Sequence, residues 1–337
     1  MKNLLKFTIL LFIIIIYNHP SLSQEVQITE APDWIKKNLG TYKDTVDTNL
    51  YDDLLIKLSK NDSNYVWPVQ GPYPLKGAIL PFNRIVAYYG NLYTPQMGVL
   101  GTRPSSLMLN QLKKTVKAWE VADPSTPVIP ALHYVTIVAS ATPANDNLYI
   151  KRMPDKQIET VIDLAQQINA LVFLDIQPGF STLENESPRL EKYLSLPNVH
   201  LGIDPEFFMK GSLPPGKAIG NITAKEINYA INYLSNIVKT KNLPPKILVI
   251  HRFRVAMLKS YQNINLTREV QFVLHMDGWG SPKQKKYTYL MAVYKEPVQF
   301  AGFKIFYKND LKLAPNRLMG PEELLELSPI PIYIQYQ

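Results

Sequence analysis

The stretch ALVFLDIQPG, residues 170–179, begins with five apolar residues and ends with Asp175, Gln177 and a Pro-Gly pair. A nearly continuous apolar run of this length is typical of a parallel strand that is buried on both faces. Polar residues at its end fit the carboxyl edge of a parallel sheet, where α/β proteins place their functional sites. The stretch therefore predicts an α/β fold with a parallel sheet.

Seven similar stretches surround this one and alternate with segments of helical apolar spacing. We predict strands at 83–90, 127–138, 170–179, 199–207, 246–253, 270–278, 300–310 and 331–337. We predict helices at 105–120, 155–168, 189–194, 223–239, 255–261, 283–293 and 321–327. The helix at 223–239 has the clearest start, because Thr223 is a good N-cap and Glu226 completes a capping box.

Eight strands with helices between them predict a single closed (β/α)8 (TIM) barrel. The alternative is an open doubly wound sheet. Such a sheet would carry a glycine-rich phosphate turn after its first strand, and YYGNLYTPQMGVLG at residues 88–101 does not match GxGxxG. The barrel is therefore the favoured architecture.

The N-terminal segment does not follow the barrel pattern. Two lysines precede an apolar run at residues 7–17, which is shorter than the roughly 20 residues of a membrane-spanning helix. Ser21 and Ser23 have the size expected at the −3 and −1 positions of a cleavage site. We therefore expect residues 1–23 to be a signal peptide and the mature chain to be exported, to the periplasm or outside the cell. An uncleaved membrane anchor is the alternative.

Residues 24–82 are polar, with one predicted helix at 50–58 and a Pro/Gly-rich passage at 67–81. We interpret residues 24–82 as an N-terminal extension or linker that leads into a barrel at 83–337. No later segment is apolar enough to span a bilayer, so no stable membrane span is expected after cleavage.

The composition narrows the classes of function. The chain has no cysteine, which excludes disulfides, thiolate metal sites, a cysteine nucleophile and a lipid anchor at a lipobox cysteine. An exported chain without disulfides suggests a bacterial origin. The formal net charge of +8 falls to +6 without the two lysines of the signal peptide. The basic residues are scattered and do not interleave with aromatic residues, so no nucleic-acid partner is expected.

Polar side chains stand where the predicted strands end. They are Tyr88, Tyr89, His133, Asp175, Gln177, Asp204, Glu206, His251, Arg252, His275 and Asp277. Several are two positions apart, a spacing that places both side chains on one face of a strand. The carboxylates and histidines belong mainly to the third to sixth strands, which predicts a site on one side of the barrel mouth.

Carboxylates buried together raise the pKa of one of them, which can then serve as a general acid. We expect Glu206 to be that acid, because Glu is a poor turn residue and apolar residues surround it. Asp175 or Asp277 is the expected catalytic partner, and the remaining residues are expected to bind substrate. Structural roles are the alternative. Asp204 precedes a proline and Asp277 a glycine, as turn residues and helix caps often do, and the histidines and tyrosines could belong to the core.

Sharper catalytic motifs are missing from the sequence. It contains no GxSxG elbow, no HExxH and no HxH at the end of the first predicted strand. A divalent ion held by Asp175, Asp204, Glu206 and His251 stays an open alternative, and we assign no metal site and no cofactor.

Five strings carry a resemblance to a family of exported bacterial TIM-barrel proteins without a known activity. They are LDIQPG, LGIDPEF, IGNITAKEIN, LPPKILVIHRF and MDGWG, which are similar to the family's LDxQxG, DPEW/F, IGxxxAxEIN, PxKxLxxHQF and DGxG. The resemblance covers residues 85–337 and is most specific from 175 to 251. Phe207 replaces the family's Trp, and Arg252 replaces its Gln. The resemblance implies a barrel with Asp175, Gln177, Asp204, Glu206, His251 and Asp277 around the mouth.

Glycoside hydrolysis fits this set of residues, since it needs two carboxyl groups that flank the bond. The seventh strand offers Lys304, Lys308 and Asp310 but no Glu, a departure from the familiar retaining pattern. We therefore favour inversion, with carboxyl groups roughly 6.5–9.5 Å apart. The expected partner is a glycan or another polar envelope ligand. A non-catalytic glycan- or envelope-binding barrel and a metal-dependent hydrolase are the alternatives.

Overall fold

The computed structural model describes residues 45–64, 66–144 and 146–337. The expected signal peptide at 1–23 and residues 24–44 of the expected extension lie outside these ranges. The chain divides into compact units at 1–30 and 31–337, and the described residues all belong to the second. No helix among them is long and apolar enough to cross a membrane.

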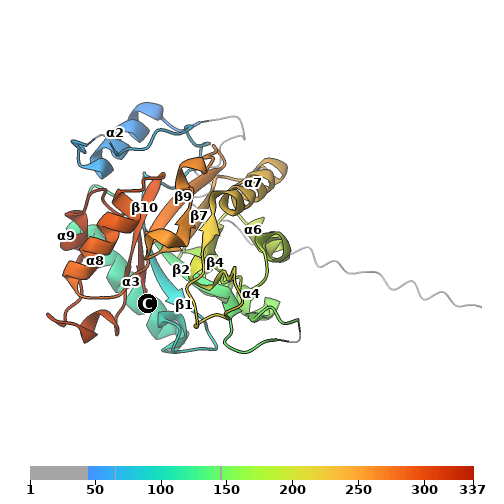
Figure 1. Cartoon of the computed structure of the whole chain (residues 1–337). Helices are drawn as coiled ribbons and strands as arrows, with labels where there is room; N and C mark the ends of the chain where they lie inside the picture. The colour runs from blue at the N-terminus through green and yellow to red at the C-terminus, as the bar shows by residue number, and fades with distance from the viewer. Residues whose placement is uncertain (1–44, 65, 145) are drawn as a thin grey trace, which may run out of the picture. The chain divides into compact units, whose positions relative to one another are not determined.

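Eight parallel strands close into a barrel (Figure 1). They are β1 (Arg84–Gly90), β2 (Val128–Ala139), β4 (Leu171–Ile176), β5 (Val199–Ile203), β7 (Lys246–Arg252), β9 (Val270–Met276), β10 (Phe300–Ile305) and β11 (Tyr333–Tyr336). The sheet closes because β1 pairs with β11 on one side and with β2 on the other. The protein is therefore a (β/α)8 barrel, as predicted, and the open doubly wound sheet is excluded.

Helices pack around the strands in chain order. They are α3 (Ser105–Ala122), α4 (Asp155–Gln166), α5 (Leu183–Glu186), α6 (Glu191–Leu194), α7 (Ala224–Lys241), α8 (Pro282–Tyr289) and α9 (Pro321–Leu325). The capping box that starts α7 is present, because Thr223 and Glu226 bond each other's backbone amides. A π-helical turn, η6 (Leu290–Tyr294), extends α8. Short 3-10 turns are η1 (Val99–Gly101), η2 (Ser187–Leu190), η3 (Pro205–Phe207), η4 (Val255–Met257), η5 (Tyr261–Asn263) and η7 (Asp310–Lys312).

The helix expected at 255–261 is wrong. The chain there forms η4, the two-residue strand β8 (Leu258–Lys259) and η5, and β8 pairs with β6 (Ile222–Thr223). Side-chain bonds from Arg252 to the carbonyls of Arg254 and Val255 hold the start of this segment. Ser260 then adopts a left-handed conformation with φ 59°, which no α-helix can contain. A further strand, β3 (Ile150–Arg152), pairs antiparallel with β2 and was not predicted.

The amino end of the barrel is closed by the segment before β1. The helix α2 (Thr48–Ser59), predicted at 50–58, places Tyr51 in an apolar cluster with Leu80 and residues from the barrel interior. The side chain of Gln271 accepts hydrogen bonds from the backbone amides of Ile79 and Leu80 at 2.9 and 3.1 Å. Figure 1 shows α2 at the end of the barrel opposite the C-terminus. The carboxyl ends of the strands are thus the end available for a site.

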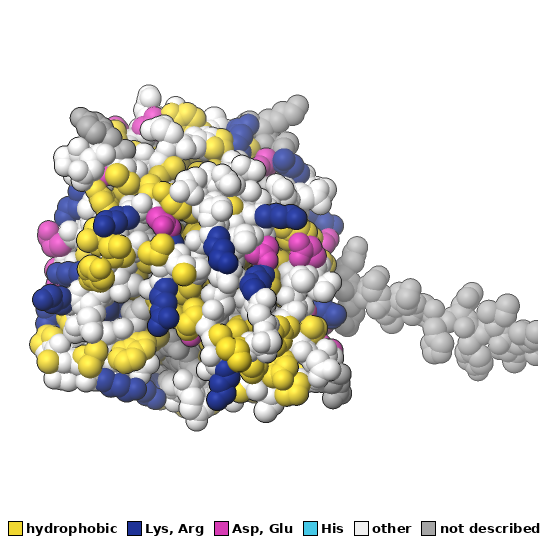
Figure 2. All heavy atoms as spheres, viewed as in Figure 1, with side chains coloured by type: hydrophobic (Ala, Val, Ile, Leu, Met, Phe, Trp, Pro, Cys, Tyr) yellow, Lys and Arg dark blue, Asp and Glu magenta, His cyan; other side chains and the backbone are white. Residues whose placement is uncertain are grey.

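Charged side chains are dispersed over the face shown in Figure 2, where Lys and Arg alternate with Asp, Glu and apolar groups. No histidine is visible on this face. The four histidines of the described chain, His133, His200, His251 and His275, have no exposed surface. The histidines expected at the mouth therefore lie inside the barrel.

Candidate functional site

A cavity of about 430 Å³ opens at the carboxyl ends of the strands. Its polar lining includes Tyr89, Gln177, Asp204, Glu206, Asp277 and Lys304. Its aromatic lining comes from Phe207, Phe253, Trp279 and Phe306. The structure thus brings together five of the residues expected at the mouth, one in β1 and four in the segments just after β4, β5 and β9, and adds Lys304 from β10.

Asp204 lies at the edge of the cavity as the N-cap of η3. The strand β5 ends at Ile203, one residue earlier than this carboxylate. Oδ1 of Asp204 accepts a hydrogen bond from the amide of Glu206 at 3.0 Å, and Oδ2 accepts one from Nε2 of Gln177 at 3.3 Å. Burial raises the pKa of Asp204 to about 8, an effect that His251 opposes and neighbouring carboxylates reinforce. Asp204 therefore caps η3, the structural role expected as an alternative, and also lines the cavity.

Glu206 faces the cavity with a free carboxyl group. Among the described residues, no hydrogen bond or ion pair reaches its side chain, which is partly exposed. Burial raises the pKa of Glu206 to about 7, and the negative charge of Asp277 reinforces the shift while Lys304 opposes it. Near neutral pH a substantial fraction of Glu206 therefore carries a proton, as a general acid requires.

Asp277 differs from Glu206, because its carboxyl group has two partners and its pKa is lowered. It follows β9, and its Oδ2 lies 2.8 Å from Nδ1 of His251, while its Oδ1 lies 3.1 Å from Nζ of Lys304. Burial alone would raise the pKa of Asp277, but Lys304 and His251 outweigh burial and lower it well below its usual value. Nζ of Lys304 also lies 3.7 Å from the ring centre of Tyr89, a cation–π contact. The cavity thus holds an ionised carboxylate beside a carboxyl group that tends to stay protonated.

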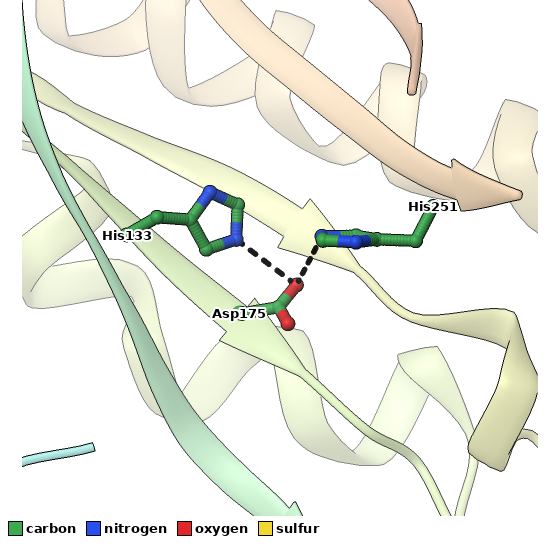
Figure 3. A group of neighbouring side chains, drawn as sticks. All are labelled: His133, Asp175 and His251. Atoms are coloured by element: carbon green, nitrogen blue, oxygen red, sulfur yellow. Dashed lines mark ion pairs between the residues drawn. The ribbon is translucent and has the colours of Figure 1, made fainter. Parts of the chain in front are cut away.

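Beneath the cavity, Asp175 lies between two imidazoles (Figure 3). Its Oδ1 lies 3.4 Å from Nε2 of His133 and 3.6 Å from Nε2 of His251. All three side chains are fully buried. Burial favours the neutral acid, but the two histidines outweigh it and lower the pKa of Asp175. Asp175, expected as a catalytic partner, is therefore placed under the cavity rather than on its surface.

Three other expected residues lie away from the cavity lining. Tyr88 packs between the barrel and its helices and bonds Thr115 of α3 at 2.8 Å. Arg252 also points outward, where its guanidinium binds the carbonyl of Ala292 at 3.0 Å and a carboxylate oxygen of Glu296 at 2.5 Å. His275 is buried inside the barrel, with its ring centre 5.1 Å from that of His251.

Lys304 and Trp279 line the cavity but were not among the expected site residues. Lys304 had a signal in the sequence, since a lysine inside the apolar run FAGFKIF must find a partner when it is buried. Trp279 had a weaker signal, its place in the MDGWG string just after β9. Its side chain is 53% exposed, which leaves the indole available to a ligand.

A single group among the described residues has the spacing of metal ligands, and it consists of His133, Asp175 and His251. The alternative set expected from the sequence shared Asp175 and His251 with this group. It contained Asp204 and Glu206 instead of His133.

Known proteins resemble the chain only in structure. No protein-family model matches it, and the comparison with curated proteins finds no match. A broad-specificity GH5-4 endoglucanase from Clostridium acetobutylicum has TM-score 0.39 and 10% identity over 75% of this chain and 87% of its own. GH26C from Muricauda sp. has TM-score 0.30 and 11% identity over 75% and 70%.

A hyperthermophilic endo-β-1,4-glucanase has TM-score 0.29 and 11% identity over 58% of this chain, which spans 60% of the length of that enzyme. TM-scores and identities this low say nothing about activity. The resemblance to exported barrel proteins of unknown activity receives no support from these comparisons.

Proposed function

We propose that this protein is an exported hydrolase that cleaves glycosidic bonds in a glycan. The observation that carries the proposal is the pairing of Glu206 and Asp277 in one cavity with opposite protonation preferences. A pair of titratable groups whose surroundings push their pKa values apart is the pattern expected of an acid and a base in one site.

Glu206 is the proposed general acid, which protonates the leaving oxygen of the glycosidic bond. Asp277 is the proposed ionised partner, which accepts a proton from the attacking water in an inverting reaction. Lys304 and His251 keep Asp277 ionised and hold its orientation. Asp277 takes this role in preference to Asp175, because Asp277 lines the cavity and Asp175 does not.

The rest of the cavity suits a sugar. Trp279 offers an exposed indole face, and aromatic faces stack against the apolar side of sugar rings. Gln177, Asp204 and Tyr89 supply hydrogen-bonding groups in the lining of the same cavity. A cavity with aromatic faces and a few placed polar groups is the usual form of a small-ligand site.

The test is a reducing-end assay of the mature protein on a panel of plant, algal and bacterial polysaccharides, beside Glu206→Gln. We expect new reducing ends on at least one polysaccharide, and loss of that activity in the variant. Equal turnover by the variant would show that Glu206 is not the acid. Saturable binding without turnover by the wild type would instead identify a non-catalytic glycan-binding barrel. The anomeric form of the first product, followed by NMR, tests inversion.

A further inference from the structure

Four buried polar atoms meet beneath the cavity without hydrogen-bond partners. They are Nε2 of His133, Nε2 of His251 and both carboxylate oxygens of Asp175. The nitrogens lie 3.4 and 3.6 Å from Oδ1 of Asp175, beyond the distances of about 2.7–3.2 Å typical of good hydrogen bonds. A buried polar atom without a partner destabilises the folded state, because it loses its hydrogen bonds to water without replacement. Such a group in a native structure calls for an explanation, such as an ordered water, a bound ion, backbone strain or a catalytic role.

Two of the three separations between these donor atoms are close to those around a tetrahedral metal ion. Zinc binds imidazole nitrogen and carboxylate oxygen at about 2.0–2.2 Å, which places neighbouring donors roughly 3.4 Å apart. The three ligand atoms lie within 4.8 Å of one another, and two of their separations are 3.4 and 3.6 Å. Figure 3 shows both imidazoles directed at the same oxygen of Asp175. Because the residues come from β2, β4 and β7, the barrel sheet holds the three donors in place.

The outer nitrogen of each imidazole has a partner that prepares the inner nitrogen for a metal. Nδ1 of His133 lies 2.6 Å from the hydroxyl of Tyr333, and Nδ1 of His251 lies 2.8 Å from Asp277. When Nδ1 carries the proton, Nε2 is left with a free lone pair. Metal-binding histidines almost always have such an oxygen partner on the far nitrogen.

The backbone leaves room beside these atoms at one glycine. A Cβ atom on Gly202, in β5, would collide with Oδ1 of Asp175 and lie 2.6 Å from Nε2 of His133. A larger residue at this position would therefore displace both donors. Gly202 keeps the space next to the cluster free of side-chain atoms.

We propose that His133, Asp175 and His251 bind one divalent transition-metal ion beneath the active-site cavity. Two imidazoles and one carboxylate favour zinc, cobalt, nickel or iron over magnesium and calcium, which prefer oxygen ligands. Three protein ligands leave a coordination position for water. Through the bond between His251 and Asp277, the ion positions a carboxylate of the cavity.

The proposal is tested first on the full mature protein without any variant. Protein stripped with a chelator is titrated with zinc, cobalt, iron(II), magnesium and calcium by calorimetry, and the bound metal is quantified by mass spectrometry. We expect one equivalent of zinc or cobalt per chain, and a visible spectrum of the cobalt form with nitrogen coordination. Anomalous scattering from crystals of the metal-loaded protein should place the ion within about 2.2 Å of the three donors.

Variants then locate the site. We expect Asp175→Asn and His251→Gln to weaken zinc binding by at least 100-fold. His200→Gln is the matched control, since His200 is an equally buried barrel histidine whose Nδ1 accepts from the amide of Ile247. Its zinc affinity should equal that of the wild type. If the ligand variants fail to fold, Gly202→Ala tests the same site without changing a ligand.

Several results would overturn the proposal. They are a stoichiometry below about 0.1 for every transition metal, tighter binding of calcium or magnesium than of zinc, and an anomalous peak elsewhere. In those cases His251 is protonated, and the cluster is held by an ion pair between His251 and Asp175 without a metal. Metal binding is measured without any glycan, so its outcome is independent of the Glu206→Gln assay that tests the proposed function.

Discussion

Nζ of Lys304 lies 3.1 Å from Oδ1 of Asp277, and both side chains line the cavity, that of Lys304 buried and that of Asp277 only 9% exposed. The two residues come from neighbouring parts of the barrel, β10 and the end of β9. A buried carboxylate needs such a partner, because an unpaired buried charge is costly. The pair therefore supports both the fold and the ionised state that the proposed reaction requires.

Lys304→Met should lower kcat/KM for glycan hydrolysis by about 100-fold, since Asp277 loses the cation that keeps it ionised. The free energy of unfolding in urea should also fall by roughly 3–5 kcal/mol, as expected when one partner of a buried pair is removed. Lys308→Met is the matched control, because Lys308 is exposed and close in sequence. An unchanged kcat/KM for Lys304→Met would remove Lys304 from the mechanism.

The hydrolysis rate should fall as the pH rises through about 7, because burial raises the pKa of Glu206 to about 7 and the acid acts in its protonated form. The measurement is the pH profile of kcat/KM between pH 4 and 9. Glu206→Gln should lose about 10²–10⁴-fold in rate and show no such alkaline limb. Glu184→Gln, an exposed glutamate on α5, should keep the wild-type profile. A rate that climbs between pH 7 and 9 would contradict the assignment.

Trp279→Ala should raise KM or the glycan dissociation constant by about tenfold, because the exposed indole is the proposed stacking face. Its effect on stability should stay within about 0.5 kcal/mol, since the side chain is 53% exposed. Binding is measured by calorimetry or by affinity electrophoresis in the polysaccharide. Tyr287→Ala removes another exposed aromatic ring, outside the cavity lining, and should bind like the wild type. Equal affinities for both variants would place the sugar elsewhere.

Asp310→Asn should destabilise the fold by roughly 3–5 kcal/mol in urea unfolding. Nζ of Lys285 lies 2.8 Å from Asp310, and both side chains are buried. The carboxylate of Asp310 also accepts hydrogen bonds from the backbone amides of Gly280 and Phe306, each at 2.9 Å. These bonds connect the segments that follow β9 and β10. Glu120→Gln breaks the exposed pair with Lys117 and should cost less than about 1 kcal/mol. Similar losses of unfolding free energy in the two variants would show that the buried pair stabilises the fold no more than the exposed pair does.

The barrel could be predicted because its signals are local. Apolar runs and helical spacing recur along the chain, and each depends on residues close in sequence. The helix expected at 255–261 is wrong partly because Leu258 and Lys259 pair as β8 with β6, an earlier segment that local spacing does not contain. Arg252 bonds nearby carbonyls, and Ser260 takes a left-handed conformation, so apolar residues at helical spacing form turns instead.

The candidate site was predictable in composition and less so in arrangement. Glu206 and Asp277 follow apolar strands, and the carboxyl ends of parallel strands meet at one edge. The same reasoning could not show whether Asp175 lines the cavity and touches the substrate. Whether a carboxylate at a strand end lies on the cavity surface or one layer below depends on the register between strands.

By itself, the sequence determined the eight barrel strands, most of the helices between them, the closed barrel and the end of it that carries the polar residues. Only the tertiary structure decided which of two adjacent residues faces inward. Tyr89 lines the cavity while Tyr88 packs against α3, and His251 faces the interior while Arg252 binds the outer layer. The physical reason is that successive side chains of a strand point to opposite faces, so a shift of one residue exchanges inside and outside. Pairing with both neighbouring strands fixes that choice, and those strands are distant in sequence.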